Sequence, residues 1–144
     1  MKVLFDTSVL IAALVRPHPF HKQAFPWLKQ AHEKEIEFIV SAYTLAELYH
    51  VLTNFPIKPR LSSGSVKRII KEDVVKIAQV IHLTAEEYFQ VIEKTADFNL
   101  PGGIIFDAII CAVAEKMNVD KLLTFNLNDF ERLWPEKKEI IEKP

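Results

Sequence analysis

Short, strongly apolar runs recur along the chain and predict buried β-strands. Longer segments separate them, and in these the apolar residues return every three or four positions, which indicates helices packed by one face. The runs that predict strands cover residues 2–5, 37–40, 79–83 and 121–124, with 139–142 as a candidate edge strand.

Capping and breaking residues set the limits of the predicted helices. Pro17 ends the first helix, Pro26 kinks or splits the second, and Ser41 is a suitable N-cap for the third. Thr84 and Glu87 have the spacing of a capping box at the start of a later helix. The predicted helices cover residues 8–15, part of 18–34, 41–54, 65–78, 84–98 and 105–117, with a short last helix at 128–134 and a loop at 55–64.

Strands that alternate with helices predict an α/β fold. Right-handed crossovers place such strands in a mainly parallel sheet with helices on both faces, a three-layer α/β/α sandwich. With 49% hydrophobic residues in 144, the chain matches one domain over residues 1–144 that can bury a core. The apolar runs fall short of the ~20 residues of a membrane span. Cys111 has no second cysteine to pair with, so we expect a cytoplasmic protein.

Two aspartates stand where the apolar pattern does not explain them. Asp6 interrupts the segment KVLFDTSVLIAALV directly after the first strand, at the sheet edge where α/β folds bind ligands, although, taken alone, it is more typical of a cap for the next helix. Asp107 lies in GIIFDAIICAVA, where a buried carboxylate requires a cation or hydrogen-bond donors beside it. The alternative for Asp107 is an exposed first-turn acid favoured by the helix dipole.

Glu47 and the segment TFNLNDF complete the set of unexplained polar residues. Glu47 is either a solvated helix position, a capping-box partner of Thr44, or a site residue. Thr124, Asn126 and Asp129 follow the last clear strand and so return to the edge of the first one. Either of the last two also serves as a simple helix cap.

Together these residues outline an acidic pocket. Carboxylates that converge without Lys or Arg between them repel one another, and the usual remedy is a hard divalent cation, Mg²⁺ or Mn²⁺. Zinc would normally require nitrogen or sulfur ligands. A bound Mg²⁺ lowers the pKa of water and stabilises charge on a phosphoryl group, which makes phosphodiester hydrolysis the leading chemistry.

Four motifs, taken in order, resemble the PIN domain family and span nearly all of residues 2–134. They are Asp6-Thr7-Ser8, Glu47 in the helix after the second strand, FDAIICAVA with Asp107, and LLTFNLNDF with Thr124, Asn126 and Asp129. The length and the absence of additions resemble, more narrowly, the VapC toxin ribonucleases of toxin–antitoxin pairs.

The resemblance implies a set of roles. Asp6, Glu47 and Asp107 would be the catalytic acids that bind Mg²⁺, with Thr7, Ser8 and Thr124 in support. Many relatives have Asp where this chain has Asn126, which removes one charge, leaves the number of metals open and makes Asp129 the candidate fourth acid. The family further implies an RNA substrate, frequent homodimers, and a small antitoxin whose tail enters the acidic groove.

The formal net charge of -1 means that any RNA contact depends on local patches. Residues 58–76 are locally basic, and a solvated helix face explains them as well as RNA binding does. The RNA-binding candidates there are Lys58, Arg60, Lys67, Arg68 and Lys71.

Two further groups of residues have ordinary explanations. Tyr43, Tyr49 and Trp27 could stack on bases, although their helical spacing is more typical of core residues. His18 and His21 are more typical of surface residues than of a metal pair.

Three functions are compatible with these residues. The first, which we expect, is a Mg²⁺-dependent endoribonuclease, the toxin of a VapBC-type pair. The second is a Mg²⁺-dependent phosphohydrolase of a small phosphate ester, which would need a second Asp where Ser8 stands. The third is a non-catalytic PIN-like module that binds RNA or protein.

Overall fold

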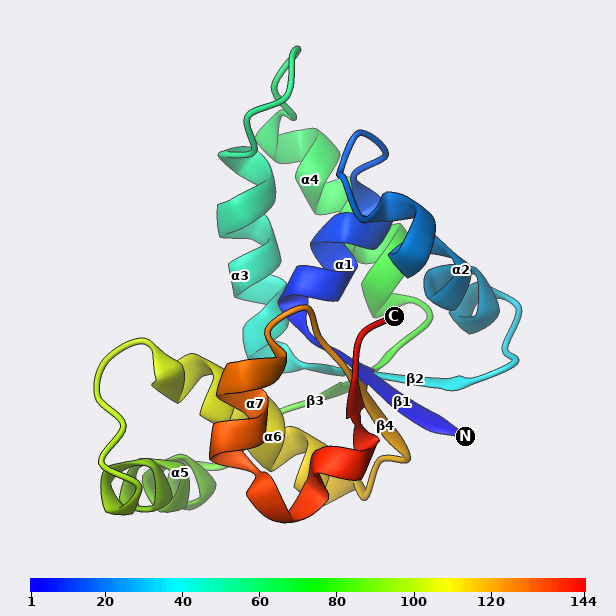
Figure 1. The fold of residues 1–144 in the computed structure, drawn as a ribbon. Helices are drawn as coiled ribbons and strands as arrows, with labels where there is room; N and C mark the ends of the chain where they lie inside the picture. The colour runs from blue at the N-terminus through cyan, green and yellow to red at the C-terminus, as the bar shows by residue number, and fades with distance from the viewer.

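Five parallel strands form one sheet at the centre of the molecule (Figure 1). The computed structural model describes residues 1–144. The strands are β1 (Lys2–Phe5), β2 (Glu37–Ser41), β3 (Gln79–Ile81), β4 (Lys121–Leu123) and β5 (Ile141–Glu142). Their order across the sheet is β3-β2-β1-β4-β5, so β1 lies in the middle.

Helices cover both faces of this sheet, which confirms the predicted three-layer α/β/α architecture. None of them combines the length and the apolar character that a membrane span requires. The helical elements are α1 (Thr7–Leu14), α2 (His21–His32), α3 (Ala42–Thr53), α4 (Ser63–Ile70), the π-helix η1 (Lys71–Val75), α5 (Ala85–Asp97), α6 (Ile104–Met117), α7 (Leu127–Leu133) and the 3₁₀-helix η2 (Pro135–Ile140).

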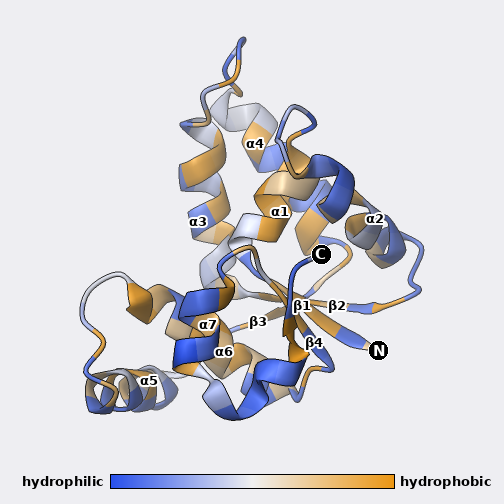
Figure 2. Cartoon of the chain, viewed as in Figure 1, coloured by the Kyte–Doolittle hydropathy of each residue, from blue (hydrophilic) through white to orange (hydrophobic).

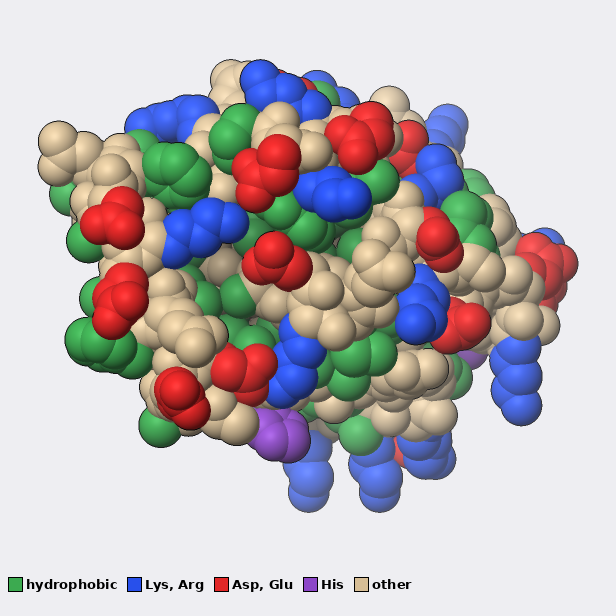
Figure 3. Space-filling model, turned by 90° about the horizontal axis from the view of Figure 1, so that it is seen from below, with side chains coloured by type: hydrophobic (Ala, Val, Ile, Leu, Met, Phe, Trp, Pro, Cys, Tyr) green, Lys and Arg blue, Asp and Glu red, His purple; other side chains and the backbone are tan.

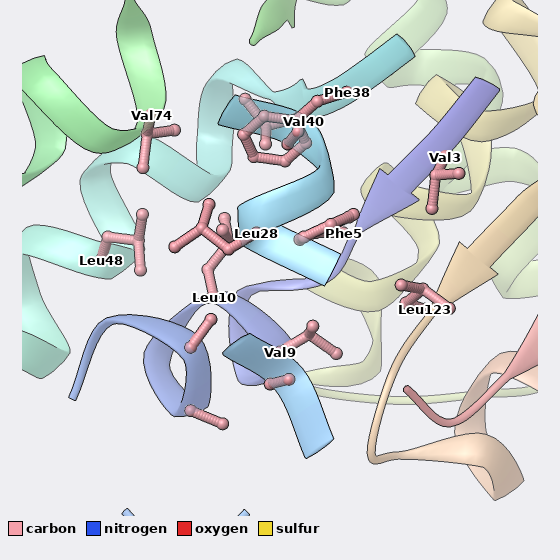
Figure 4. Packing of buried hydrophobic residues seen from close by; sticks show 14 of the residues in the cluster. Val3, Phe5, Val9, Leu10, Leu28, Phe38, Val40, Leu48, Val74 and Leu123 are labelled. Carbon is pink, nitrogen blue, oxygen red and sulfur yellow. The ribbon is translucent and has the colours of Figure 1, made fainter. Parts of the chain in front are cut away.

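The sheet divides the apolar interior into two clusters because successive strand side chains point to opposite faces. Val3 and Phe5 of β1 belong to the cluster under α1, α2, α3 and α4, which Figure 4 shows from close by. Leu4, between them, belongs to the other cluster, with residues of α5, α6 and α7. Apolar residues accordingly dominate the strands, and the helices mix apolar and polar residues (Figure 2).

Side-chain caps start four of the helices. Asp6, Ser41, Ser62 and Thr84 each accept a hydrogen bond from a backbone N–H of the first turn. The predicted capping box is confirmed, since Thr84 and the Glu87 side chain bond each other's backbone N–H at 3.1 and 3.0 Å.

The structure corrects several predicted boundaries. The basic helix expected at 65–78 begins at Ser63, because Ser62 caps it, and it changes to a π-helix after Ile70. Pro26 lies inside α2 without splitting it, since Ala24 and Leu28 hold the helix against the core on either side of the proline. The strand expected at 79–83 ends two residues early.

The topology brings the carboxyl ends of three neighbouring strands to the same end of the sheet. The carboxyl ends of β1, β2 and β4 lie side by side, and each strand continues there into a helix or a short turn before one. Residues that follow these three strands are therefore neighbours in space, as the sequence predicts.

Phe130, on α7, is fully buried in the second cluster. We expect Phe130→Ala to lower the free energy of unfolding by about 3–5 kcal/mol, because it removes buried apolar surface and leaves a cavity. Urea denaturation measures this loss. Phe25→Ala is the matched control, because this ring is 45% exposed, and its effect should stay within about 0.5 kcal/mol. Equal losses in the two variants would contradict the assigned core.

Candidate active site

Asp6 is the first polar residue after β1, and only 4% of its surface is exposed. Its backbone N–H donates to the carbonyl of Leu123 at 2.9 Å, which joins the ends of β1 and β4. Its carboxylate accepts hydrogen bonds from the backbone N–H of Thr7 and from the hydroxyls of Ser8 and Thr124, at 2.7, 2.7 and 2.9 Å. The helix-cap interpretation is correct, but it accounts for only the first of these three bonds.

Glu47 reaches the same region from α3. The hydroxyl of Thr7 donates to Glu47 Oε2 at 2.9 Å, and the hydroxyl oxygen of Thr44 lies 3.3 Å from that of Thr7. Because Ser41 caps α3, the alternative role of Glu47 as a capping-box partner of Thr44 is wrong. Thr7 therefore connects the residue after β1 directly to the acid on α3.

Asp107 lies in the first turn of α6 and is half-buried. None of the ion pairs in the structure includes this carboxylate, so the expected neighbouring cation is not supplied by a Lys or Arg of the chain. Its hydrogen-bond partner is the side-chain amide of Asn126, which donates at 3.1 Å. A neutral donor offsets only part of the cost of placing a carboxylate there.

Asn126 joins two of the acids. The same amide nitrogen that bonds Asp107 donates to Asp129 Oδ2 at 2.8 Å. Asp129 also lies 3.4 Å from Nη1 of Arg132, an exposed pair on α7. At this position Asn serves as a hydrogen-bond donor to the acids, a role that an ionised Asp could not fill.

Repulsion among the acids shows in their pKa values. Burial first, and then the nearby charges of Asp6, Asp129 and Glu47, together raise the pKa of Asp107 to about 7. Burial also raises the pKa of Asp6, in spite of its three donors, and that of Glu47, which the charge of Asp6 raises as well. The four carboxylates thus form one electrostatically coupled site.

The donor set fits a hard divalent cation. Carboxylate, hydroxyl and amide oxygens are the ligands that Mg²⁺ prefers, and no Cys or His stands among them. As the side chains stand in this structure, no three acidic, His or Cys side chains lie close enough together to hold a metal ion between them. An open arrangement suits Mg²⁺, which commonly binds through one or two carboxylates and keeps several of its waters. The residues that could hold it are Asp6, Glu47 and Asp107, with Asp129 at the outer side.

The basic candidates lie mostly away from these acids. Lys58 and Arg60 belong to the loop that projects beyond the ends of α3 and α4, far from the sheet (Figure 1). Lys67 and Lys71 line a hollow between α3 and α4, next to Tyr49. Arg68 is exposed on α4. Acidic and basic side chains are interspersed on the face around α5 and η2 (Figure 3), so neither positive nor negative charge dominates that face.

The two histidines serve local structure. Nδ1 of His18 accepts a hydrogen bond from the backbone N–H of Phe20 at 3.1 Å, and Nδ1 of His21 lies 2.9 Å from the carbonyl oxygen of Ala12. These contacts hold the turn between α1 and α2.

Sequence reasoning missed three phenylalanines beside the acids. Phe106 precedes Asp107, Phe125 lies between Thr124 and Asn126, and Phe20 stacks on Phe125 at a centroid distance of 4.8 Å. The available signal was the position of Phe106 and Phe125 next to motif residues. Tyr43, which the sequence did single out, stacks on Phe106.

Comparison with known proteins identifies the family of this chain. The model of the PIN domain family matches residues 3–133. Ribonuclease VapC27 of Mycobacterium tuberculosis (strain ATCC 25618 / H37Rv) is 33% identical over 109 residues, which are 76% of this chain and 74% of the relative.

Solved structures share the fold at lower identity. VapBC2 from Rickettsia felis, bound to a DNA fragment from its promoter, superimposes with a TM-score of 0.68 and 22% identity, covering 100% of this chain and 99% of the other. VapC20 from Mycobacterium tuberculosis, described as a Sarcin-Ricin loop cleaving toxin, has a TM-score of 0.63 and 19% identity, covering 83% and 86%. The acids lie at the carboxyl ends of the strands, and the family model matches residues 3–133. The chain therefore belongs to the PIN domain family and is similar to the VapC ribonucleases within it.

Proposed function

We propose that this protein is a Mg²⁺-dependent endoribonuclease that hydrolyses RNA phosphodiester bonds. The observation that carries the proposal is the convergence of Asp6, Glu47 and Asp107 from three separate elements, without a Lys or Arg to neutralise them. Chains rarely keep such repulsion unless a function requires it. The name of the ribonuclease relative supports RNA as the substrate.

The chain's own residues would prepare the site for a cation and a phosphate. Thr7, Ser8 and Thr124 orient Asp6 and Glu47 by hydrogen bonds, as residues around a metal site commonly orient its ligands. Asn126 holds Asp107 and Asp129 on the more exposed side. Mg²⁺, when bound, would lower the pKa of the attacking water and stabilise negative charge on the phosphoryl oxygens.

The two alternative functions have less support. A small-ester phosphohydrolase of the expected kind would need a second Asp at position 8, where Ser8 instead donates to Asp6. A non-catalytic module would be expected to lose one of the acids, and the only departure from the family's pattern is Asn126.

We propose two protein partners in addition. The solved neighbours include VapBC complexes from Rickettsia felis and nontypeable Haemophilus influenzae, which supports a small antitoxin as partner and a toxin role for this chain. Tyr88, Phe89 and Ile92 are exposed apolar residues of α5 and support a homodimer. Cleavage of cellular RNA would place the enzyme in the cytoplasm.

Removing one charge from the site should slow cleavage strongly. We expect Asp6→Asn and Asp107→Asn each to lower the rate of RNA cleavage with Mg²⁺ by about 100-fold or more, because each removes a ligand charge. Gel analysis of a labelled RNA measures the rate. Excess EDTA should stop the parent, and Asp97→Asn, an exposed acid at the end of α5, should cleave like the parent. Undiminished cleavage by both site variants would contradict the proposal.

Metal binding has a second readout in stability. The pKa of Asp107 is about 7 in the folded protein and near 3.8 in the unfolded chain. Without metal, the contribution of this carboxyl group to the free energy of unfolding therefore falls as the pH rises from about 4 to 7, and it stays low at higher pH. Asp107→Asn removes this loss. We expect the variant, in EDTA at pH 8, to exceed the parent's free energy of unfolding by roughly 1–2 kcal/mol, a figure reduced for partial exposure.

Urea denaturation at pH 4 and pH 8 measures this difference, which should nearly vanish at pH 4. Mg²⁺ at pH 8 should stabilise the parent and leave Asp107→Asn almost unchanged, since only a bound ligand shifts the unfolding equilibrium. A parent that is more stable than the variant in EDTA at pH 8 would show that the carboxylate is not repelled in its site.

A further inference from the structure

Two stacked aromatic pairs flank the acids. Phe106 and Tyr43 stack with their rings 2° from parallel and centroids 5.2 Å apart, and we call them the Phe106 pair. Phe20 and Phe125 stack at 22° with centroids 4.8 Å apart, and we call them the Phe20 pair. In each pair the inner ring is half-buried, whereas the outer ring, Phe106 or Phe20, is 46% exposed.

Both pairs are attached directly to the residues of the site. Phe106 is the neighbour of Asp107, and Tyr43 lies one helical turn before Glu47 on the same face of α3. The backbone N–H of Phe125 donates to the hydroxyl of Ser8, which in turn bonds Asp6. The pairs therefore share their supports with the acids.

The pairs come from opposite layers of the fold. Tyr43 packs against the cluster under α5, α6 and α7, whereas Phe125 packs against the cluster on the other face of the sheet. The acids lie at the sheet edge between the two layers. A strand of nucleic acid that crosses this edge can thus meet one pair on each side of the acids.

The outer rings are held in place rather than loose. Tyr43 supports Phe106 from one side. Phe20 stacks on Phe125 and lies 5.9 Å from the His18 ring, and its backbone N–H bonds His18 Nδ1. An exposed ring whose position is already fixed loses little conformational entropy when another flat group stacks on it.

Electrostatics gives a reason for such rings here. Four carboxylates repel the phosphates of an approaching RNA, and Arg132, the basic side chain that contacts one of them, is occupied by Asp129. Stacking of bases on aromatic rings does not depend on charge and contributes about 1–3 kcal/mol per base. It also requires bases that are free of a duplex, because a paired base is already stacked.

We propose, on the basis of the proposed function, that the Phe106 pair and the Phe20 pair each bind an unpaired base, one on either side of the scissile phosphate. Phe106 and Phe20 are positioning residues that hold the RNA strand across the acids, and they take no part in bond cleavage.

Binding to RNA tests the proposal independently of cleavage. The probe is a fluorescently labelled, unstructured oligoribonucleotide that contains all four bases, measured by anisotropy in EDTA, with its integrity checked on a gel. We expect Phe106→Ala and Phe20→Ala each to weaken binding about tenfold. Phe106→Trp should restore it, whereas Phe106→Leu, which keeps an apolar side chain without a ring, should remain weak. Phe98→Ala is the control, since Phe98 is 41% exposed at the end of α5.

The outcomes separate this proposal from the proposed function. If the protein fails to cleave RNA but its variants show this order of RNA affinities, the proposed nuclease function is wrong and the proposal that the two aromatic pairs bind bases stands. If the parent cleaves RNA and both alanine variants bind RNA as tightly as the parent, the proposed base binding is wrong and the proposed nuclease function stands. If Phe106→Ala and Phe106→Leu reduce the molecular mass in solution without weakening RNA binding, Phe106 serves a protein interface and the proposal is wrong. The same oligonucleotide in a fully paired duplex should bind all variants equally weakly, and tight duplex binding would likewise contradict it.

Discussion

Mutual repulsion among buried carboxylates is the constraint on which the rest of this structure depends. Asp6 comes from the end of β1, Glu47 from α3 and Asp107 from α6. Burial raises the pKa of all three, and the other acids further raise those of Glu47 and Asp107. In a fold selected for stability alone, one of them would be replaced or paired with a Lys or Arg. The chain instead surrounds the acids with neutral donors. A divalent cation is the partner that suits such a set, because it removes the repulsion and provides the chemistry for phosphodiester cleavage.

The neutral donors explain how the fold tolerates this arrangement. Thr7 and Thr124 each hold an acid with a hydroxyl, and both are buried at strand ends where the backbone is already fixed by the sheet. Asn126 spans Asp107 and Asp129 with one amide nitrogen. Its neutrality lowers the charge of the outer site by one relative to an Asp. Asp6 and Glu47 therefore form an inner pair held by hydroxyl donors, and Asp107 and Asp129 form an outer pair joined by one amide.

The sequence predicted the architecture because its signals are local and mutually consistent. Alternation of short apolar runs with amphipathic segments was enough for the parallel sheet, and the Thr84–Glu87 spacing was enough for a capping box. Boundaries failed where a competing cap acted, as at Ser62, or where packing outweighed a proline, as at Pro26. The neighbouring positions of Asp6 and Asp107 followed from strand ends and motif order. The directions and partners of side chains could not be predicted in this way. They include the amide of Asn126 pointing toward two acids, the lack of a cation beside Asp107, and the stacking of Phe106 and Phe20. All of these depend on tertiary contacts that sequence spacing does not encode.

The most direct test of the central claim is carbon-detected NMR of the side-chain carboxyl groups during titration with Mn²⁺, whose unpaired electrons broaden nearby signals. One shared cation site predicts that the carboxyl signals of Asp6, Glu47 and Asp107 broaden together at substoichiometric Mn²⁺, before those of exposed acids such as Asp97 and Glu136, and that Mg²⁺ in excess restores them. Broadening that begins at exposed acids, or that affects Asp6 and Asp107 at clearly different Mn²⁺ concentrations, would contradict the claim that these residues bind one metal.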